Sequence, residues 1–220
     1  MTKQETLPSK PLNPKTTIRD HMKKHPSMSP DNIALQESWC KCRSKAISDG
    51  ARSAAGKCFC LLYDMHISLG NVLVIGPQHG FELIEWKLLT QSQNADSAVI
   101  GLEPVPLFAQ DCRDLGFPVL EKSAESLRAE DLPTENGPFN IYCRHTAEHF
   151  VDRDLAFQNM LSLDPEWIYL EVPVEPEVPR DKAHLSSFKS HKEASGCLDG
   201  LVWSKMSHST FFGLFCPAKS

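Results

Sequence analysis

The chain has 220 residues, of which 41% are apolar and 23% charged, which is enough for one well-buried domain and short for two. Sixteen prolines and eleven glycines are too few for a collagen-like or low-complexity chain. A membrane span needs about 18 or more apolar residues in a row, and no stretch of this sequence approaches that length. A secretory signal has an apolar segment after its first basic residues, and the first residues of this chain have none. We therefore expect a cytoplasmic protein.

The charge distribution argues against a nucleic-acid partner. The formal net charge is −5, and residues 1–30 hold six basic side chains against two acidic ones, so the remainder of the chain is more acidic than the total. Proteins that bind nucleic acid by neutralising phosphates need the opposite balance. The four tryptophans are dispersed and predict no stacking platform for single strands.

Residues 1–30 are predicted to form a flexible leader. They are polar, include five prolines and show almost no apolar periodicity, so they cannot bury enough surface to offset the entropy of ordering. A turn at Ser29 to Asp31, followed by apolar residues at helical spacing, predicts a helical amino-terminal cap over residues 31–66. The remaining residues, 67–220, are predicted to form the main domain.

Strand-like and helix-like segments alternate from residue 71 onward. Short apolar runs predict strands at 71–75, 97–103, 117–120, 138–143 and 167–172. Helices are predicted between them at 81–89, 106–115 and 152–163. Short buried strands separated by helices indicate a parallel sheet covered on both faces, so the fold class is α/β, doubly wound. A short helix at 190–198 then precedes two strands, 201–207 and 210–216, whose short connection predicts an antiparallel pair.

Four predicted loops follow the carboxyl ends of the strands, where ligands of such sheets bind. The turn from Gly76 to Gly80 would aim backbone amides at a polar or anionic group. Glu103 ends the second strand, where a carboxylate facing an open crevice can accept hydrogen bonds from ribose hydroxyls. The third strand is followed by Ser123 to Glu125, and the fourth by Arg144 to His149.

Together these segments resemble the class I S-adenosylmethionine-dependent methyltransferases, in particular the branch with a glutamate-histidine pair after the fourth strand. The matching segments are Val72–Gly80, Val99–Pro104, Phe139–His149, Trp167–Pro173 and His184–Phe188. The resemblance covers about residues 71–220. It implies a Rossmann-like, mostly parallel seven-stranded sheet with an antiparallel edge, S-adenosylmethionine as cofactor, and methyl transfer to a small molecule at oxygen.

The resemblance also implies which residues form the site. The cofactor would contact Gly76, Pro77, Gly80, Glu103, Pro104, Ala124, Glu125, Arg144 and His145. His149 and His184 are the candidate general bases for an acceptor hydroxyl, because imidazole titrates near neutrality. His149 could equally well serve to stabilise its own loop. The alternative for His184 is an exposed loop histidine without a catalytic role. Residues 31–66 and 173–191 would line the acceptor pocket, and no residue of the site is assigned to a metal.

Several positions depart from the family pattern. Val74 stands where an acidic residue is usual, Gln78 replaces a second glycine, and Asn140 replaces an aspartate of the fourth strand. Ser123 stands where an acid often opens the adenine loop, which leaves Glu125 as a displaced candidate. These departures leave a second function open, in which a noncatalytic domain keeps the fold to bind a partner.

Two sequence patterns resemble metal-binding motifs. The run from His145 to His149 has the His-x-x-Glu-His spacing of inverted zinc peptidases, but it follows a strand directly, so we disfavour that function. Cys40-x-Cys42 and Cys58-x-Cys60 resemble paired zinc ligands with an irregular spacer, and a structural zinc at these four cysteines is the alternative to small buried side chains.

Overall fold

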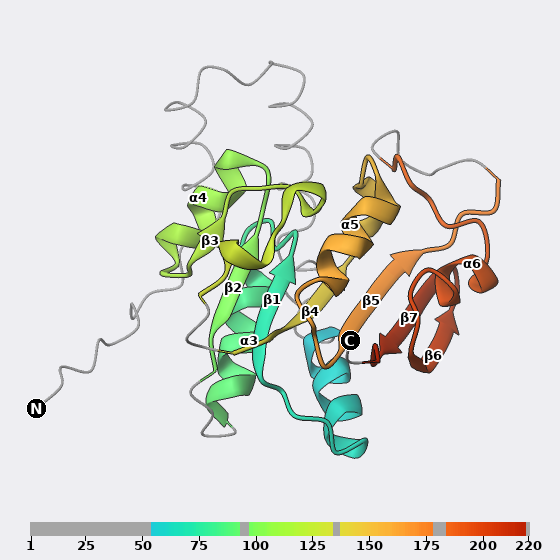
Figure 1. Cartoon of the computed structure of the whole chain (residues 1–220), viewed down its shortest axis with the longest axis horizontal. Coiled ribbons are helices and arrows are strands. Elements are labelled where there is room, and N and C mark those ends of the chain that lie inside the picture. The colour runs from blue at the N-terminus through green and yellow to red at the C-terminus, as the bar shows by residue number, and fades with distance from the viewer. Residues whose placement is uncertain (1–53, 93–96, 134–136, 178–183, 219–220) are drawn as a thin grey trace, which may run out of the picture. The chain divides into compact units, whose positions relative to one another are not determined.

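The computed structural model describes residues 54–92, 97–133, 137–177 and 184–218 (Figure 1). The predicted leader and the part of the predicted cap before residue 54 lie outside these residues. No helix within the described ranges is both long and apolar enough to cross a lipid bilayer.

A seven-stranded sheet forms the centre of the domain, in the order β3-β2-β1-β4-β5-β7-β6 (Figure 1). The strands are β1 (Asn71–Ile75), β2 (Val99–Leu102), β3 (Val119–Leu120), β4 (Phe139–Arg144), β5 (Ile168–Pro173), β6 (Leu201–Ser207) and β7 (Thr210–Phe215). The first five are parallel, and β7 runs antiparallel between β5 and β6. The predicted α/β class is confirmed, as is the mostly parallel sheet with an antiparallel edge.

Helices cover both faces of the sheet because its buried strands present apolar side chains alternately to each side. The helices are α3 (Phe81–Ser92), α4 (Pro106–Asp114), α5 (Arg153–Leu161) and α6 (His191–Ser195), with short 3-10 turns at η1 (Ala124–Ser126), η2 (Ala129–Asp131) and η4 (Ala147–His149). Leu73 and Ile75 of β1 pack with residues of α5, α6 and η1, whereas Val72 and Val74 pack with α3 and α4. Each strand and helix predicted after residue 70 is present, with ends that differ by no more than three residues.

Residues 54–64 are helical and belong to the core of this domain. Ala55, Cys58 and Leu62 are buried together with Trp86 and Trp167 in the apolar cluster on the α3 side of the sheet. The predicted boundary between a helical cap and a domain beginning at residue 67 therefore does not describe this helix, which packs against the sheet rather than over a substrate pocket.

The same helix separates two of the four cysteines considered for zinc. Cys58 is buried in the core, and burial raises the pKa of its thiol well above the usual value, whereas Cys60 is exposed. Residues two apart on a helix point in different directions, so both sulfurs cannot reach one metal ion while this helix is intact. The structure thus contradicts the four-cysteine zinc site, although Cys40 and Cys42 lie outside the described residues.

Asn140 fastens the amino ends of three strands. Its side-chain amide donates to the carbonyl of Leu69 at 2.9 Å, and its Oδ1 accepts from the backbone N–H groups of Glu166 at 2.8 Å and Trp167 at 3.1 Å. An aspartate, which the family pattern favours here, has no hydrogen to donate when it is ionised. The departure from the pattern therefore has a structural reason.

Asn140→Asp is expected to lower the free energy of unfolding by about 1–3 kcal/mol, because it leaves the partly buried Leu69 carbonyl without its donor. Urea unfolding measures this. Gln158→Glu, the same chemical change on the exposed face of α5, is the matched control and should change little. Equal stability of Asn140→Asp and the wild type would contradict the structural reason given above.

Candidate functional site

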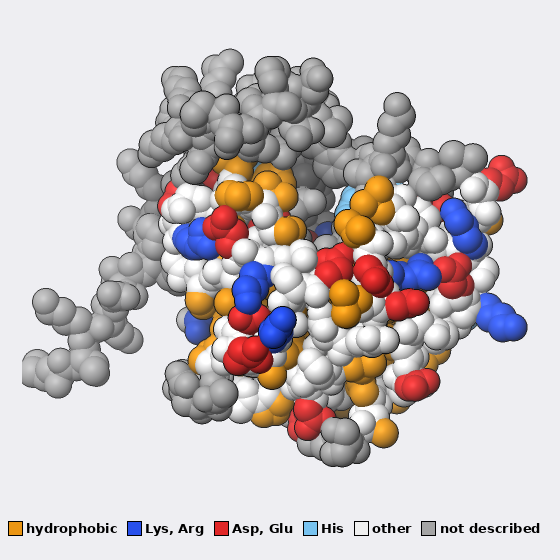
Figure 2. Space-filling model, turned by 45° about the horizontal axis from the view of Figure 1, so that its top comes forward, with side chains coloured by type: hydrophobic (Ala, Val, Ile, Leu, Met, Phe, Trp, Pro, Cys, Tyr) orange, Lys and Arg blue, Asp and Glu red, His pale blue; other side chains and the backbone are white. Residues whose placement is uncertain are grey.

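The candidate site lies at the carboxyl ends of the parallel strands, where the strand order reverses between β1 and β4. The arrowheads of β1 and β5 point toward this edge in Figure 1. Figure 2 brings the edge forward and shows a hollow, with a histidine side chain in its wall, between groups of apolar side chains. The loops after β1, β2 and β4 all begin at this edge.

The loop after β1 is a tight turn in which three of five residues have positive φ. These are Gly76 (65°), Gln78 (48°) and Gly80 (80°). A Cβ at Gly76 would stand 2.5 Å from Oγ1 of Thr146, so this glycine admits the side chain of the loop after β4. A Cβ at Gly80 would stand 2.8 Å from Leu115, so the second glycine serves packing of the loop against the end of α4.

Glu103 holds this loop against the end of β2. Its side chain is only 3% exposed, and its two oxygens accept from the backbone N–H groups of Gln78 and Val105, each at 3.0 Å. Burial raises the pKa of this carboxyl to about 7, although both N–H donors and His79 oppose the shift. The expectation of a carboxylate open to a crevice is wrong, because the left-handed backbone at Gln78 folds an N–H back onto it. The two backbone N–H groups use about two of the four acceptor positions of a carboxylate.

The loop after β3 is tied to the start of α5. Ala124 is buried in the core, and Glu125 Oε1 accepts from the N–H of Val151 at 2.8 Å. The side chain of Asn159 donates to the carbonyls of Ala124 and Glu125 at 3.1 and 2.7 Å. Pro104, after β2, is exposed. Glu125 is thus held by the backbone at the start of α5. A role for Pro104, Ala124 and Glu125 in cofactor binding stays a prediction.

Arg144 and His145, after β4, converge on a carboxylate that the sequence analysis did not single out. Glu171 lies in β5, and its Oε1 accepts from Arg144 Nε at 3.2 Å and lies 3.1 Å from His145 Nε2. Arg144 also donates to Glu82 of α3 at 3.1 Å, and His145 Nδ1 lies 3.6 Å from Glu148 Oε1. The signal that could have revealed this network is a glutamate in the middle of an otherwise apolar, buried strand.

This network sets the charges at the edge. Burial alone would lower the pKa of His145, but hydrogen bonds to Glu148 and Glu171 outweigh it and raise the pKa to about 9. Burial alone would raise the pKa of Glu171, but His145 and Arg144 hold it below the usual value. His145 is therefore protonated at neutral pH, where it acts as a fixed positive charge.

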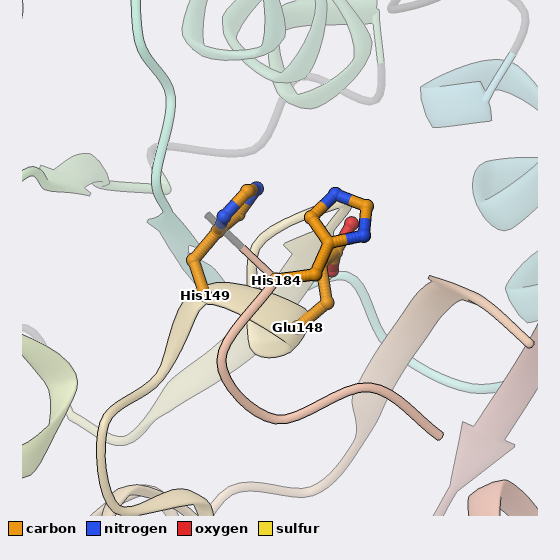
Figure 3. A group of neighbouring side chains, drawn as sticks. All are labelled: Glu148, His149 and His184. Atoms are coloured by element: carbon orange, nitrogen blue, oxygen red, sulfur yellow. The ribbon is translucent and has the colours of Figure 1, made fainter. Parts of the chain in front are cut away.

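The two histidines predicted to be catalytic come together, although 35 residues separate them in the sequence. The rings of His149 and His184 meet edge to face, with centroids 4.9 Å apart, and the carboxylate of Glu148 lies beside them (Figure 3). His184 Nδ1 is 3.0 Å from Glu175, a buried residue that the sequence analysis did not identify. A cavity of about 520 Å³ between the start of α5 and residues 184–189 has His184 in its wall.

The raised pKa of His145 predicts a pH-dependent contribution to stability. Protonated His145 stabilises the folded protein fully below its ordinary pKa of about 6.5, and this contribution is lost as the pH rises through about 9. His145→Asn should therefore remove part of the loss of thermal stability that the wild type shows between pH 7 and pH 10. His208→Asn is the control, because His208 is exposed and also has positive φ. Identical pH profiles for the wild type and His145→Asn would contradict the ion pairs described here.

Solved structures place this fold among methyltransferases. No protein-family model matches the chain, and no curated protein gives a significant match. The magnesium protoporphyrin IX methyltransferase ChlM from Synechocystis PCC 6803 with bound S-adenosylhomocysteine has a TM-score of 0.59 and 11% identity, over 93% of this chain and all of that one. The plantazolicin methyltransferase BamL with S-adenosylhomocysteine has a TM-score of 0.58 and 11% identity, over 84% of this chain and 72% of that one. At such identities the likeness shows the fold alone, a mostly parallel seven-stranded sheet with an antiparallel edge that this chain shares with these two methyltransferases.

Proposed function

We propose that this domain binds S-adenosylmethionine at the carboxyl ends of β1, β2 and β4 and transfers its methyl group to a small molecule, at oxygen. The observation that carries the proposal is the position of Glu103. Its carboxylate stands at the end of β2, with the turn after β1 held against it, at the reversal of strand order where nucleoside ligands of doubly wound sheets bind. The S-adenosylhomocysteine bound in the ChlM and BamL structures supports the same ligand.

The proposed cofactor site uses three loops. The ribose hydroxyls would donate to the acceptor positions of Glu103 that Gln78 and Val105 leave available. We assign the adenine to the loop of Ala124 and Glu125, beside Pro104. The methionine end would lie at Gly76, Pro77 and Gly80, near the positive charges of Arg144 and His145, which suit a carboxylate.

The acceptor would bind in the part of the cleft lined by His149 and His184. S-adenosylmethionine supplies a methyl group already activated on a sulfonium, so the protein mainly provides proximity, alignment and removal of the acceptor proton. His145 is protonated near neutrality and is therefore a poor base. His149 and His184 remain as the candidate general bases for the acceptor. The cavity beside His184 is where we place the acceptor. We place the chain in the glutamate-histidine branch because of Glu148 and His149, and a cytoplasmic location is also part of the proposal.

Glu103→Gln should weaken binding of S-adenosylmethionine about tenfold. Hydrogen bonds to a charged group contribute about 1.5–3 kcal/mol, which corresponds to about tenfold to a hundredfold in affinity, and glutamine keeps one acceptor oxygen. Calorimetric titration with S-adenosylmethionine and S-adenosylhomocysteine measures the loss. Because Glu103 also accepts hydrogen bonds from two backbone N–H groups, the variant will be less stable than the wild type. The titration should therefore be carried out well below the unfolding temperature of the variant.

Asn140→Asp is the control for this loss of stability. It disturbs the opposite, amino end of the sheet and should bind the cofactor as the wild type does. Equal binding by the wild type and Glu103→Gln would disprove the ribose assignment. If the wild type itself does not bind either compound at millimolar concentration, the chain is better explained as a noncatalytic domain that keeps this fold to bind a partner.

A further inference from the structure

We propose that Glu148, His149 and His184 bind a first-row transition-metal dication. Each of the three offers one ligand atom, and these atoms lie within 4.8 Å of one another. Figure 3 shows the three side chains projecting to the same side of the ribbon, two from η4 and one from the segment that crosses over it. The sequence pattern pairs His145 with His149, whereas the structure pairs His149 with His184.

Glu148 provides an independent sign of a missing ligand. Its side chain is 2% exposed, and within the described structure its Oε2 is buried without a hydrogen-bond partner. Its other oxygen lies 3.6 Å from His145 Nδ1, and His145 lies closer to Glu171, at 3.1 Å. A buried carboxylate oxygen without a partner is costly, and a bound cation would remove that cost.

Glu175 is hydrogen-bonded to the ring of His184, as a carboxylate is to many metal-bound histidines. Both oxygens of Glu175 lie 3.0 to 3.1 Å from His184 Nδ1, and Ser187 donates to the same carboxylate at 2.7 Å. A partner on Nδ1 fixes the ring and leaves Nε2 as the ligand atom for a metal. Such a carboxylate-histidine pair is common at zinc sites.

The two segments that carry the ligands are fixed to each other by the backbone. The N–H of Ser186 donates to the carbonyl of Glu148 at 2.9 Å, and the Ser186 hydroxyl donates to the carbonyl of Phe150 at 2.7 Å. Glu175 donates its N–H to the carbonyl of Phe188 at 2.7 Å. The ligands therefore stand on supported backbone, which a metal site needs.

The ligand set selects the class of ion. Two imidazoles and one carboxylate suit Zn²⁺, Fe²⁺, Co²⁺ or Mn²⁺, whereas Ca²⁺ and Mg²⁺ prefer oxygen ligands only. Ligand atoms about 2.1 Å from a tetrahedral zinc stand roughly 3.4 Å apart. The present ligand atoms lie within 4.8 Å of one another, so the side chains need to close by at most about 1.4 Å. Three protein ligands leave coordination positions open. If the proposed function holds, an acceptor hydroxyl could take one and have its pKa lowered by the metal. The metal would then replace His149 and His184 as the aid to removal of the acceptor proton, because a metal-bound histidine nitrogen cannot also accept a proton.

Titration of chelator-treated full-length protein with Mn²⁺, followed by electron paramagnetic resonance, tests the proposal. Mn²⁺ is the probe because thiolates bind it weakly, so the eight cysteines contribute little. The wild type should bind one Mn²⁺ per chain, and Glu148→Gln, His149→Gln and His184→Gln should show no measurable binding at millimolar metal. Glu175→Gln should weaken binding tenfold to a hundredfold, about the usual cost of losing an outer-shell partner. His208→Asn, an exposed histidine outside the cluster, should bind as the wild type does.

Thermal unfolding distinguishes a variant that has lost a metal ligand from one that fails to fold. In chelator, the variants should unfold cooperatively, and added Mn²⁺ should raise the midpoint of the wild type but not of Glu148→Gln or His149→Gln. Absence of stoichiometric Mn²⁺ in the wild type, or wild-type affinity in the three ligand variants, would overturn the proposal. The result is independent of the cofactor, because Glu103→Gln should bind Mn²⁺ normally and Glu175→Gln should bind S-adenosylhomocysteine normally.

Discussion

The carboxylate of Glu171 is the charge on which the candidate site depends. It lies in a buried strand, where an unpaired carboxylate would be strongly unfavourable, and Arg144 and His145 of the neighbouring strand end compensate it. Its backbone carbonyl also accepts from the N–H of His145 at 2.7 Å. The loop after β4 is thereby fixed to β5 through both side chain and backbone, and Arg144 extends the connection to α3 through Glu82.

Glu103 performs a similar task one loop away. It uses both oxygens to hold the backbone of the turn after β1 and the start of the α4 connection, while Thr146 packs onto Gly76 from the other side. The turn, the end of β2 and the loop after β4 therefore form one connected structure around the point where the strand order reverses. A site built in this way is positioned before a ligand arrives, which is the condition for efficient alignment of two reactants.

Sequence patterns predicted the elements of this fold well, because each buried strand is an apolar run and each helix falls between two of them. The strand order follows from no local pattern, and the family resemblance implied only a mostly parallel seven-stranded sheet with an antiparallel edge. Burial at the site was harder to predict: Glu103 was expected to face an open crevice, and only the left-handed backbone at Gln78 explains why it does not. The meeting of His149 with His184 depends on the path of the chain between them, which the sequence does not reveal. Cys58 and Cys60 were read as a pair, but the helix turns them apart.

The central claim is that a nucleoside cofactor binds at the carboxyl ends of β1, β2 and β4. A crystal structure of the full chain grown with S-adenosylhomocysteine tests it most directly. The account predicts the ribose hydroxyls within hydrogen-bond distance of Glu103, with the amino-acid end at the turn from Gly76 to Gly80. A nucleoside bound at any other place, or this edge unchanged at saturating ligand, would contradict it.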